Sequence, residues 1–180
     1  MKDSEHLTLD SLVLSEESDD SHKQFAVASD DVSPQKRTVS SPSFQAASSK
    51  QGRQFAEQCD LLLENTSFSL GRDRLVVPDT GVEIDREARS RIGTLIWFEY
   101  KGSLQGTRPG LIRTDTLKKA IANGALLRTL PDHPPYVVLT SHLPTAGAGL
   151  HMLQTALRLG YFHDVICVYD PKQRSRLDSL

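Results

Sequence analysis

The sequence predicts an α/β (α+β) protein with a mixed central sheet flanked by helices and a disordered N-terminal tail. The composition changes near residue 50, beyond which apolar residues recur with helical and strand periods in alternation. The early strands are joined by turn-like segments, whereas the later strands alternate with helices. A hairpin supplies antiparallel pairing and strand-helix-strand units supply parallel pairing, so the sheet is expected to be mixed.

Residues 1–50 form the predicted tail. They contain twelve serines, nine acidic residues and five basic residues, which gives a net charge of −4. Their apolar runs are short, and such a segment cannot bury enough apolar surface to offset the entropy of ordering it. We therefore expect residues 1–50 to be disordered and residues 51–180 to form one folded domain.

The bulk properties exclude some classes of function. Residues 51–180 carry sixteen bases and fourteen acids, a net charge of +2, which permits a nucleic-acid partner without requiring one. Cys59 and Cys167 lie in apolar contexts without metal-ligand spacing, as free thiols in a reducing compartment do. No signal-peptide pattern and no apolar run of about 18 residues is present. We expect a soluble, cytoplasmic protein with no membrane partner.

The first predicted elements are a helix and a hairpin. Apolar residues at helical spacing predict a helix over residues 53–68, followed by a short strand at 75–77 and a turn at 78–81. Residues 82–85 alternate between apolar and acidic, and residues 94–102 are rich in strand formers. These two segments predict an antiparallel hairpin, with the charged residues 86–93 as a connection of moderate length.

The second half predicts alternating helices and strands. After a loop at 103–110, a helix begins at Thr114, with Thr114 or Asp115 as its cap. A strand at 136–142, a helix at 148–160 that ends at Gly160, and a strand at 164–170 follow. Residues 171–180 are expected to form a polar tail.

The strand at 94–102 ends in chemistry that a buried strand does not need. Glu99 and Lys101 are two residues apart, so they point to the same face, and the hairpin brings Asp85 near Glu99. Adjacent carboxylates repel each other unless a cation joins them, and Mg²⁺ or Mn²⁺ prefers such oxygen ligands. A nearby lysine would orient water or stabilise charge on a phosphate. This pattern predicts a site for phosphodiester hydrolysis.

The segment GVEID followed by IWFEYKG resembles the motif of the PD-(D/E)xK nuclease superfamily, which has the restriction-endonuclease-like fold. The resemblance extends over residues 53–170, and it implies the order helix, three-strand meander, helix, strand. It also implies a Mg²⁺- or Mn²⁺-dependent endonuclease that hydrolyses phosphodiester bonds in DNA, with RNA as an alternative substrate. The implied catalytic residues are Asp85, Glu99, Lys101 and Glu57, and the implied metal ligands are Asp85, Glu99 and the main-chain carbonyl of Tyr100.

The match departs from the family pattern at the first acid. No proline precedes Asp85, whereas the literal Pro78-Asp79 pair lies twenty residues before Glu99 in turn-like sequence. We prefer Asp85 because it ends an alternating strand. The alternative roles are a cap on the following loop for Asp85 and a solvated helix position for Glu57.

Basic residues near the motif are candidates for binding nucleic acid. Arg108 and Arg113 flank the loop after the motif, and Lys118 and Lys119 lie on the helix that follows. The alternative for all four is a solvated side chain. Because the folded part lacks a recognisable sequence-reading motif, we expect either a homodimer or a partner protein that supplies targeting.

Two other functions remain open at the level of sequence. One is a non-catalytic interaction module on the same fold. The other is a nucleotide-binding domain that uses Gly147 and Gly149 before a helix. Met152 stands where the third glycine of that pattern would fall, so a simple helix entry is the preferred interpretation of these glycines.

Overall fold

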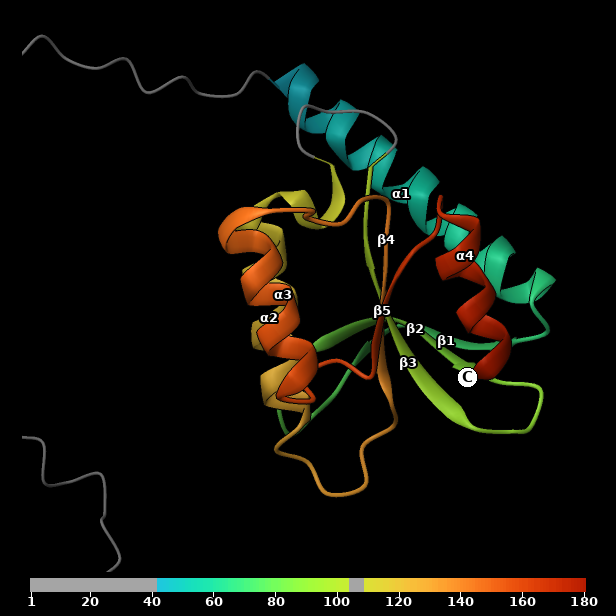
Figure 1. The fold of residues 1–180 in the computed structure, drawn as a ribbon. Coiled ribbons are helices and arrows are strands. Elements are labelled where there is room, and N and C mark those ends of the chain that lie inside the picture. Colours follow the sequence, from blue (N-terminus) through green and yellow to red (C-terminus); the bar gives the residue numbers. More distant parts are fainter. Residues whose placement is uncertain (1–41, 104–108) are drawn as a thin grey trace, which may run out of the picture. The chain divides into compact units, whose positions relative to one another are not determined.

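The computed structural model describes residues 42–103 and 109–180, with side chains from residue 50 onward within those ranges. The disorder was predicted for residues 1–50, of which residues 1–41 lie outside the described residues, whereas residues 42–50 are helical. The described chain folds into five strands and four α-helices, with short 3-10 turns (Figure 1). In chain order the elements are α1 (Pro42–Asn65), β1 (Ser69–Val76), β2 (Glu83–Arg89), β3 (Leu95–Lys101), η2 (Gly110–Ile112), α2 (Thr114–Leu127), β4 (Tyr136–Thr140), α3 (Gly147–Arg158), β5 (Asp164–Cys167), α4 (Pro171–Arg174) and η3 (Ser175–Ser179).

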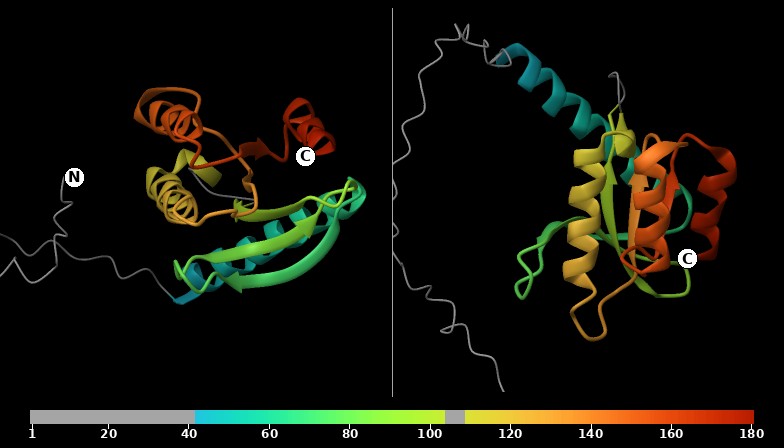
Figure 2. Two further views of the ribbon diagram at one scale, coloured as in Figure 1. Left: turned by 90° about the horizontal axis from the view of Figure 1, so that it is seen from below. Right: turned by 60° about the vertical axis from the view of Figure 1, so that its left-hand side comes forward.

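The strands form one mixed sheet in the order β1-β2-β3-β4-β5. β1, β2 and β3 pair antiparallel, while β3, β4 and β5 pair parallel. α1 covers one face of the sheet, and α2 and α3 cover the other (Figure 2). The predicted mixed sheet flanked by helices is confirmed. The order from α1 through the meander to α2 and β4 is the one that the resemblance implies.

Two apolar clusters hold these layers together, and β3 contributes to both. Ile96 and Phe98 pack with Phe55 and Cys59 on the α1 face. Trp97 packs on the α2 and α3 face with residues such as Leu117, Tyr136 and Leu153. A large side chain that is fully buried, as Phe98 is at 0% exposure, contributes about 1.5–3 kcal/mol. The alternation along β3 therefore fixes which face each motif residue takes.

The prediction for residues 86–93 was wrong, because β2 continues to Arg89. The charges that suggested a connection have partners. Arg86 pairs with Asp60 of α1, and Glu87 pairs with Arg72 of β1. Residues 90–94 alone make the turn, so the hairpin is shorter in its loop and longer in its strands than the sequence suggested.

The predicted polar tail was also wrong, because residues 171–179 form α4 and η3. Asp170 caps α4 by accepting a hydrogen bond from the Lys172 backbone N–H at 2.9 Å. Leu177 is 1% exposed and joins the cluster on the α1 face. One buried leucine in a polar segment is enough to anchor it, and it gives no periodic signal.

Two helix starts also differ from the expectation. α1 begins at Pro42 rather than near residue 53, because its first turns lack the apolar stripe on which the prediction relied. Arg113 precedes α2, and no side-chain hydrogen bond caps that helix, so neither Thr114 nor Asp115 is its cap. None of the described helices is long and apolar enough to cross a membrane.

Candidate active site

Glu99 lies on the face of β3 that α2 covers, and its side chain is 2% exposed. Three neighbours engage its carboxylate. Lys101 Nζ forms an ion pair with Oε1, Tyr136 OH donates a hydrogen bond to Oε2 at 2.7 Å, and Asn123 Nδ2 lies 3.3 Å and 3.4 Å from the two oxygens. A buried charge is tolerated only when it is paired and hydrogen-bonded. These partners hold the Glu99 carboxyl group in one orientation.

Lys101 connects this buried carboxylate to solvent. Its side chain is 23% exposed, and its strand is fixed by β4, because Thr140 Oγ1 donates to the Lys101 carbonyl at 2.7 Å. The prediction that Glu99 and Lys101 share a face agrees with their ion pair. The Lys101 side chain is therefore held by the ion pair with Glu99 while remaining partly exposed to solvent.

Asp85 lies where β2 and β3 stop pairing. The antiparallel register extends from Arg89↔Leu95 to Arg86↔Phe98. Beyond this point a side-chain hydrogen bond replaces the backbone pairing, because Asp85 Oδ2 accepts a hydrogen bond from the Tyr100 N–H at 2.7 Å. A continued register would place Asp85 opposite Glu99, so backbone pairing between the two strands ends at the position of the candidate acids.

The other face of β3 carries a second polar network, between Tyr100 and α1. Tyr100 OH donates to Asp60 Oδ1 at 2.7 Å, and Arg86 donates to both oxygens of Asp60 at 2.9 Å and 2.7 Å. A bidentate arginine-carboxylate pair of this kind has a fixed geometry. Tyr100 therefore fixes the motif strand to α1 with its side chain while its N–H holds Asp85.

Burial and neighbouring charges shift the pKa values of this cluster. Burial raises the pKa of Asp85, and Glu99 raises it further, while the Tyr100 N–H and Lys101 oppose the shift. Burial also raises the pKa of Tyr136 well above its usual value, with the Glu99 carboxylate adding to the effect. The pKa of Asp85 therefore depends on both Glu99 and Lys101. The hydroxyl group of Tyr136 remains a hydrogen-bond donor.

The residues at this position fit a divalent cation in part. Among the described residues, no group of three or more His, Cys, Asp or Glu side chains could hold a metal. Two carboxylates and a main-chain carbonyl remain as candidate ligands. The backbone N–H of Trp97 and the carbonyl of Lys101 form hydrogen bonds on the β4 side of β3. Because the backbone groups of successive residues point to opposite sides of a strand, the Tyr100 carbonyl faces β2, where Asp85 lies. Mg²⁺ is commonly held by one or two carboxylates with waters completing its shell, which this donor set allows.

The remaining predicted site residues lie on α1, before α2 and on α2. Glu57 is exposed on α1, and Arg113 is exposed before α2, whereas Arg108 lies outside the described residues. Lys118 lines a groove between α2 and α3. Lys119 is exposed one helical turn before Asn123, so it lies on the stripe of α2 that reaches Glu99. The structure therefore separates the two lysines.

Sequence reasoning missed Asp60, Arg86, Asn123 and Tyr136. A signal for Asp60 was available. On a helix with about 100° between residues, Asp60 lies about 100° from Cys59 at the centre of the buried stripe, whereas Glu57 lies about 160° away. Asp60 is thus the acid of α1 nearer the sheet. Asn123 and Tyr136 are 24 and 37 residues from Glu99 in the chain, and no local pattern links them to it.

Other features of the sequence lie apart from the cluster. Asp79 is exposed in the turn before β2, as its turn-like context suggested. Gly147 begins α3 with a φ of 67°, so the glycines that resembled a phosphate-binding turn form the entry to a helix. Both cysteines are free thiols, Cys59 buried and Cys167 half-buried.

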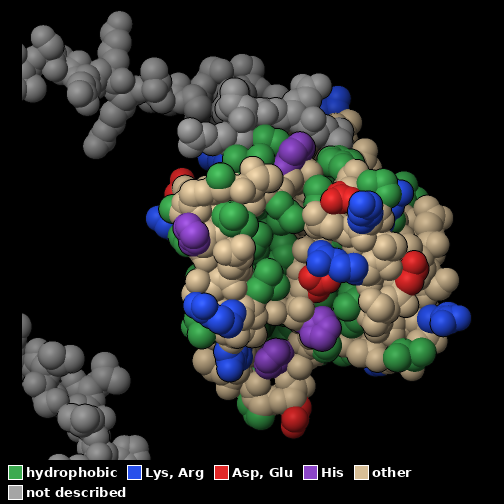
Figure 3. Space-filling view, in the orientation of Figure 1, with side chains coloured by type: hydrophobic (Ala, Val, Ile, Leu, Met, Phe, Trp, Pro, Cys, Tyr) green, Lys and Arg blue, Asp and Glu red, His purple; other side chains and the backbone are tan. Residues whose placement is uncertain are grey.

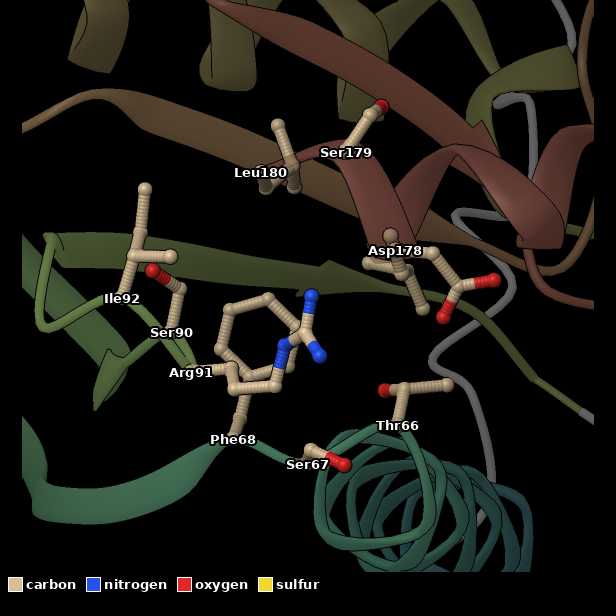
Figure 4. Close-up of a pocket in the computed structure, with 10 residues that line it drawn as sticks. Thr66, Ser67, Phe68, Ser90, Arg91, Ile92, Asp178, Ser179 and Leu180 are labelled. Carbon is tan, nitrogen blue, oxygen red and sulfur yellow. The ribbon is translucent and has the colours of Figure 1, made fainter.

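Two hollows of the described surface are separate from these residues. One cavity of about 340 Å³ lies between the end of α1, the β2-β3 turn and η3, where Arg91 extends past Phe68 (Figure 4). The groove between α2 and α3 has a volume of about 460 Å³. Neither is lined by Asp85, Glu99 or Lys101, so the candidate active site is distinct from both.

The chain matches no family model, and it matches no curated protein significantly. A solved structure described as "Structure of EndoMS-dsDNA2 complex" is similar to it, with a TM-score of 0.40 and 15% sequence identity. The similarity covers 61% of this chain and 42% of that one, so this chain spans less than half of that protein chain.

Proposed function

We propose that this chain is a nuclease that uses a divalent metal to hydrolyse phosphodiester bonds in DNA. The observation that carries the proposal is that the Glu99–Lys101 ion pair and Asp85 both lie where β2 and β3 stop pairing, with Glu99 and Lys101 both acting on the pKa of Asp85. Burial raises the pKa of Asp85 beside this ion pair, and ionisable groups with perturbed pKa values cluster at functional sites.

Asp85, Glu99 and the Tyr100 carbonyl would hold Mg²⁺ or Mn²⁺. A cation bound there would supply Lewis-acid stabilisation of the phosphate and lower the pKa of water. Glu99 is oriented by hydrogen bonds from Tyr136 and Asn123, and Lys101 offers a positive charge at the edge of the cluster. In the proposed mechanism, Lys101 orients the attacking water and stabilises the negative charge that develops on the phosphate.

The arrangement of α1 supports Asp60 rather than Glu57 as the contribution of the first helix. Asp60 does not join the metal ligands in this proposal. It fixes Tyr100, whose backbone N–H donates to Asp85 and whose carbonyl would be a ligand of the cation. Asp60 is therefore a positioning residue, and Glu57 remains a solvated side chain.

A cleavage assay tests the proposal. Labelled duplex DNA, single-stranded DNA and RNA would be incubated with the full chain and Mg²⁺ or Mn²⁺. We expect cleavage by the wild type and a loss of at least about 100-fold in Lys101→Ala and in Asp85→Ala. The exposed turn variant Asp79→Ala serves as the matched control and should cleave normally. Equal activity in all variants, or none in the wild type on any substrate, would refute the catalytic role.

One observation favours a non-catalytic interaction module on the same fold as the second candidate. Glu99 already has a complete set of partners in Lys101, Tyr136 and Asn123, so the cluster is also a self-sufficient structural network. Titration calorimetry separates the two functions. Binding of Mg²⁺ or Mn²⁺ that Asp85→Ala abolishes supports the nuclease, whereas nucleic-acid binding without metal binding supports the module.

A further inference from the structure

The groove between α2 and α3 is an apolar surface without a covering element among the described residues. It is lined by residues of both helices and by Tyr161, which follows α3. Its lining residues are Lys118, Ile121, Ala122, His151, Met152, Thr155, Ala156, Leu159 and Tyr161. The spacing of three and four residues along each helix makes the groove parallel to both helices.

Leucines exposed on the same two helices enlarge this apolar surface. Leu159 is 42% exposed and lines the groove, and Leu126 is 47% exposed one helical turn beyond Ala122. Burying apolar surface in a complex is favourable because it removes that surface from water. An apolar groove between two helices is the shape that receives the apolar face of a third helix.

The charges around the groove select the kind of helix. Lys118 lines it, and the Arg128 guanidinium lies 5.9 Å from the centre of the Tyr161 ring. Within α2 and α3, which are wholly described, Asp115 is the only carboxylate. Figure 3 shows Lys, Arg and His side chains over the side of the molecule that α2 and α3 occupy. A second copy would set these positive charges against each other, whereas an acidic helix would complement them.

We propose that the α2-α3 groove binds an amphipathic helix of a partner protein that carries leucine-like residues on one face and carboxylates on its flanks. The apolar face of the helix packs on Met152 and Leu159, and its carboxylates pair with Lys118 and Arg128 at the two ends. Asp85, Glu99 and Lys101 do not line the groove. The proposal therefore stands or fails independently of the proposed nuclease activity.

The sequence provides a specific reporter for the test. The chain contains two methionines, Met1 and Met152, so full-length protein labelled with ¹³C at the methionine methyl groups gives one signal from the groove. The probe is a synthetic 18-residue helix with leucines at helical spacing and glutamates elsewhere. We expect this peptide to shift the Met152 signal in a saturable way, and we expect the same peptide with lysines in place of glutamates not to do so.

A matched pair of substitutions locates the binding. Ala122 lines the groove and is exposed, so Ala122→Glu adds a repelling charge without burying it. Ala148 is exposed in the first turn of α3 and does not line the groove. We expect Ala122→Glu to weaken peptide binding at least tenfold and Ala148→Glu to leave it unchanged.

Three results would overturn the proposal. The first is equal or tighter binding of the lysine peptide. The second is a wild-type dimer in analytical ultracentrifugation that Ala122→Glu dissociates, since the groove would then hold a second copy. The third is a Met152 shift produced by vesicles of anionic phospholipid and not by the acidic peptide, which would make the groove a membrane contact.

Discussion

Asp85 is the residue at which a backbone hydrogen bond of the sheet is replaced by a side-chain one. Its carboxylate accepts the Tyr100 N–H that β2 would otherwise bind. The replacement leaves a half-buried acid beside Glu99, and burial raises its pKa. A residue that is unfavourable for stability in its ionised form, but chemically useful, is what stability-function trade-offs predict at a working site.

This raised pKa predicts how stability depends on pH in the presence of a metal chelator. Because the folded chain binds the Asp85 proton more tightly than the unfolded chain does, the contribution of this carboxyl is greatest below its unfolded pKa. That contribution is lost as the pH rises through the folded pKa. Asparagine does not titrate, and its side-chain oxygen can still accept the Tyr100 N–H. We expect Asp85→Asn to become more stable relative to the wild type as the pH rises above about 4.

Urea unfolding midpoints at a series of pH values would measure this difference. Asp79→Asn is the control, because Asp79 lies exposed in the turn before β2 and should show no such trend. A difference between Asp85→Asn and the wild type that stays constant with pH would contradict the assignment of the raised pKa to Asp85. Loss of cleavage in this same, more stable variant would separate function from folding.

At the scale of elements, the packing of α1 against the end of β3 depends on Gly102. A Cβ added there would lie 2.4 Å from two atoms of the Phe55 ring, whereas a Cβ added at Gly52 on α1 would meet nothing within 4 Å. Phe55 is 1% exposed, so its ring cannot move into solvent without losing its burial. The glycine directly after the motif lysine thus lets α1 approach the site.

Alanine at these two glycines is expected to act in opposite directions. Gly102→Ala should destabilise the fold by about 1–3 kcal/mol through overpacking, and it should reduce any cleavage by displacing the end of β3. Gly52→Ala should stabilise it by about 0.4–1 kcal/mol, because alanine restricts the unfolded chain and is accepted within a helix. Thermal and urea unfolding of both variants would measure the effects. A neutral Gly102→Ala would show that Phe55 repacks freely.

The elements that the sequence predicted well are those whose periodicity follows from burial. β3 has apolar residues on both faces and strong strand formers, and α2 and α3 have clear apolar stripes. β2 beyond Asp85 was missed because its charges are satisfied by Asp60 and Arg72, partners from other elements. α4 and η3 were missed because Leu177 is their one buried apolar residue, and their polar contacts, such as Arg176 with Asp164, leave no local pattern. Local patterns record burial, and they do not record long-range pairing.

The same limit applies to the candidate site across the whole molecule. Glu99 and Lys101 could be selected from the sequence, because two charged residues at the end of a buried strand are unusual. Asp85 followed from the hairpin register. Tyr136 and Asn123 come from β4 and α2, and only the folded arrangement of the sheet and helices brings them to Glu99. The motif residues could therefore be chosen from the sequence, whereas the residues that hold Glu99 in place could be identified only in the folded structure.

The whole molecule also determines where a nucleic acid would lie. Lys119 is on the stripe of α2 that reaches the cluster through Asn123, and Lys118 is in the apolar groove. A strand bound for cleavage must run past Asp85 and Lys101, so its phosphates would pass Lys119.

We expect Lys119→Ala to weaken binding of a labelled duplex and to reduce the slope of log affinity against log salt concentration by about one. Lys118→Ala should leave both the affinity and the slope unchanged. Fluorescence anisotropy at several salt concentrations, with Ca²⁺ replacing Mg²⁺ to suppress cleavage, would measure both quantities. A larger effect of Lys118→Ala would mean that nucleic acid crosses the α2-α3 groove, which would contradict both the proposed path past the site and the acidic helix proposed for that groove.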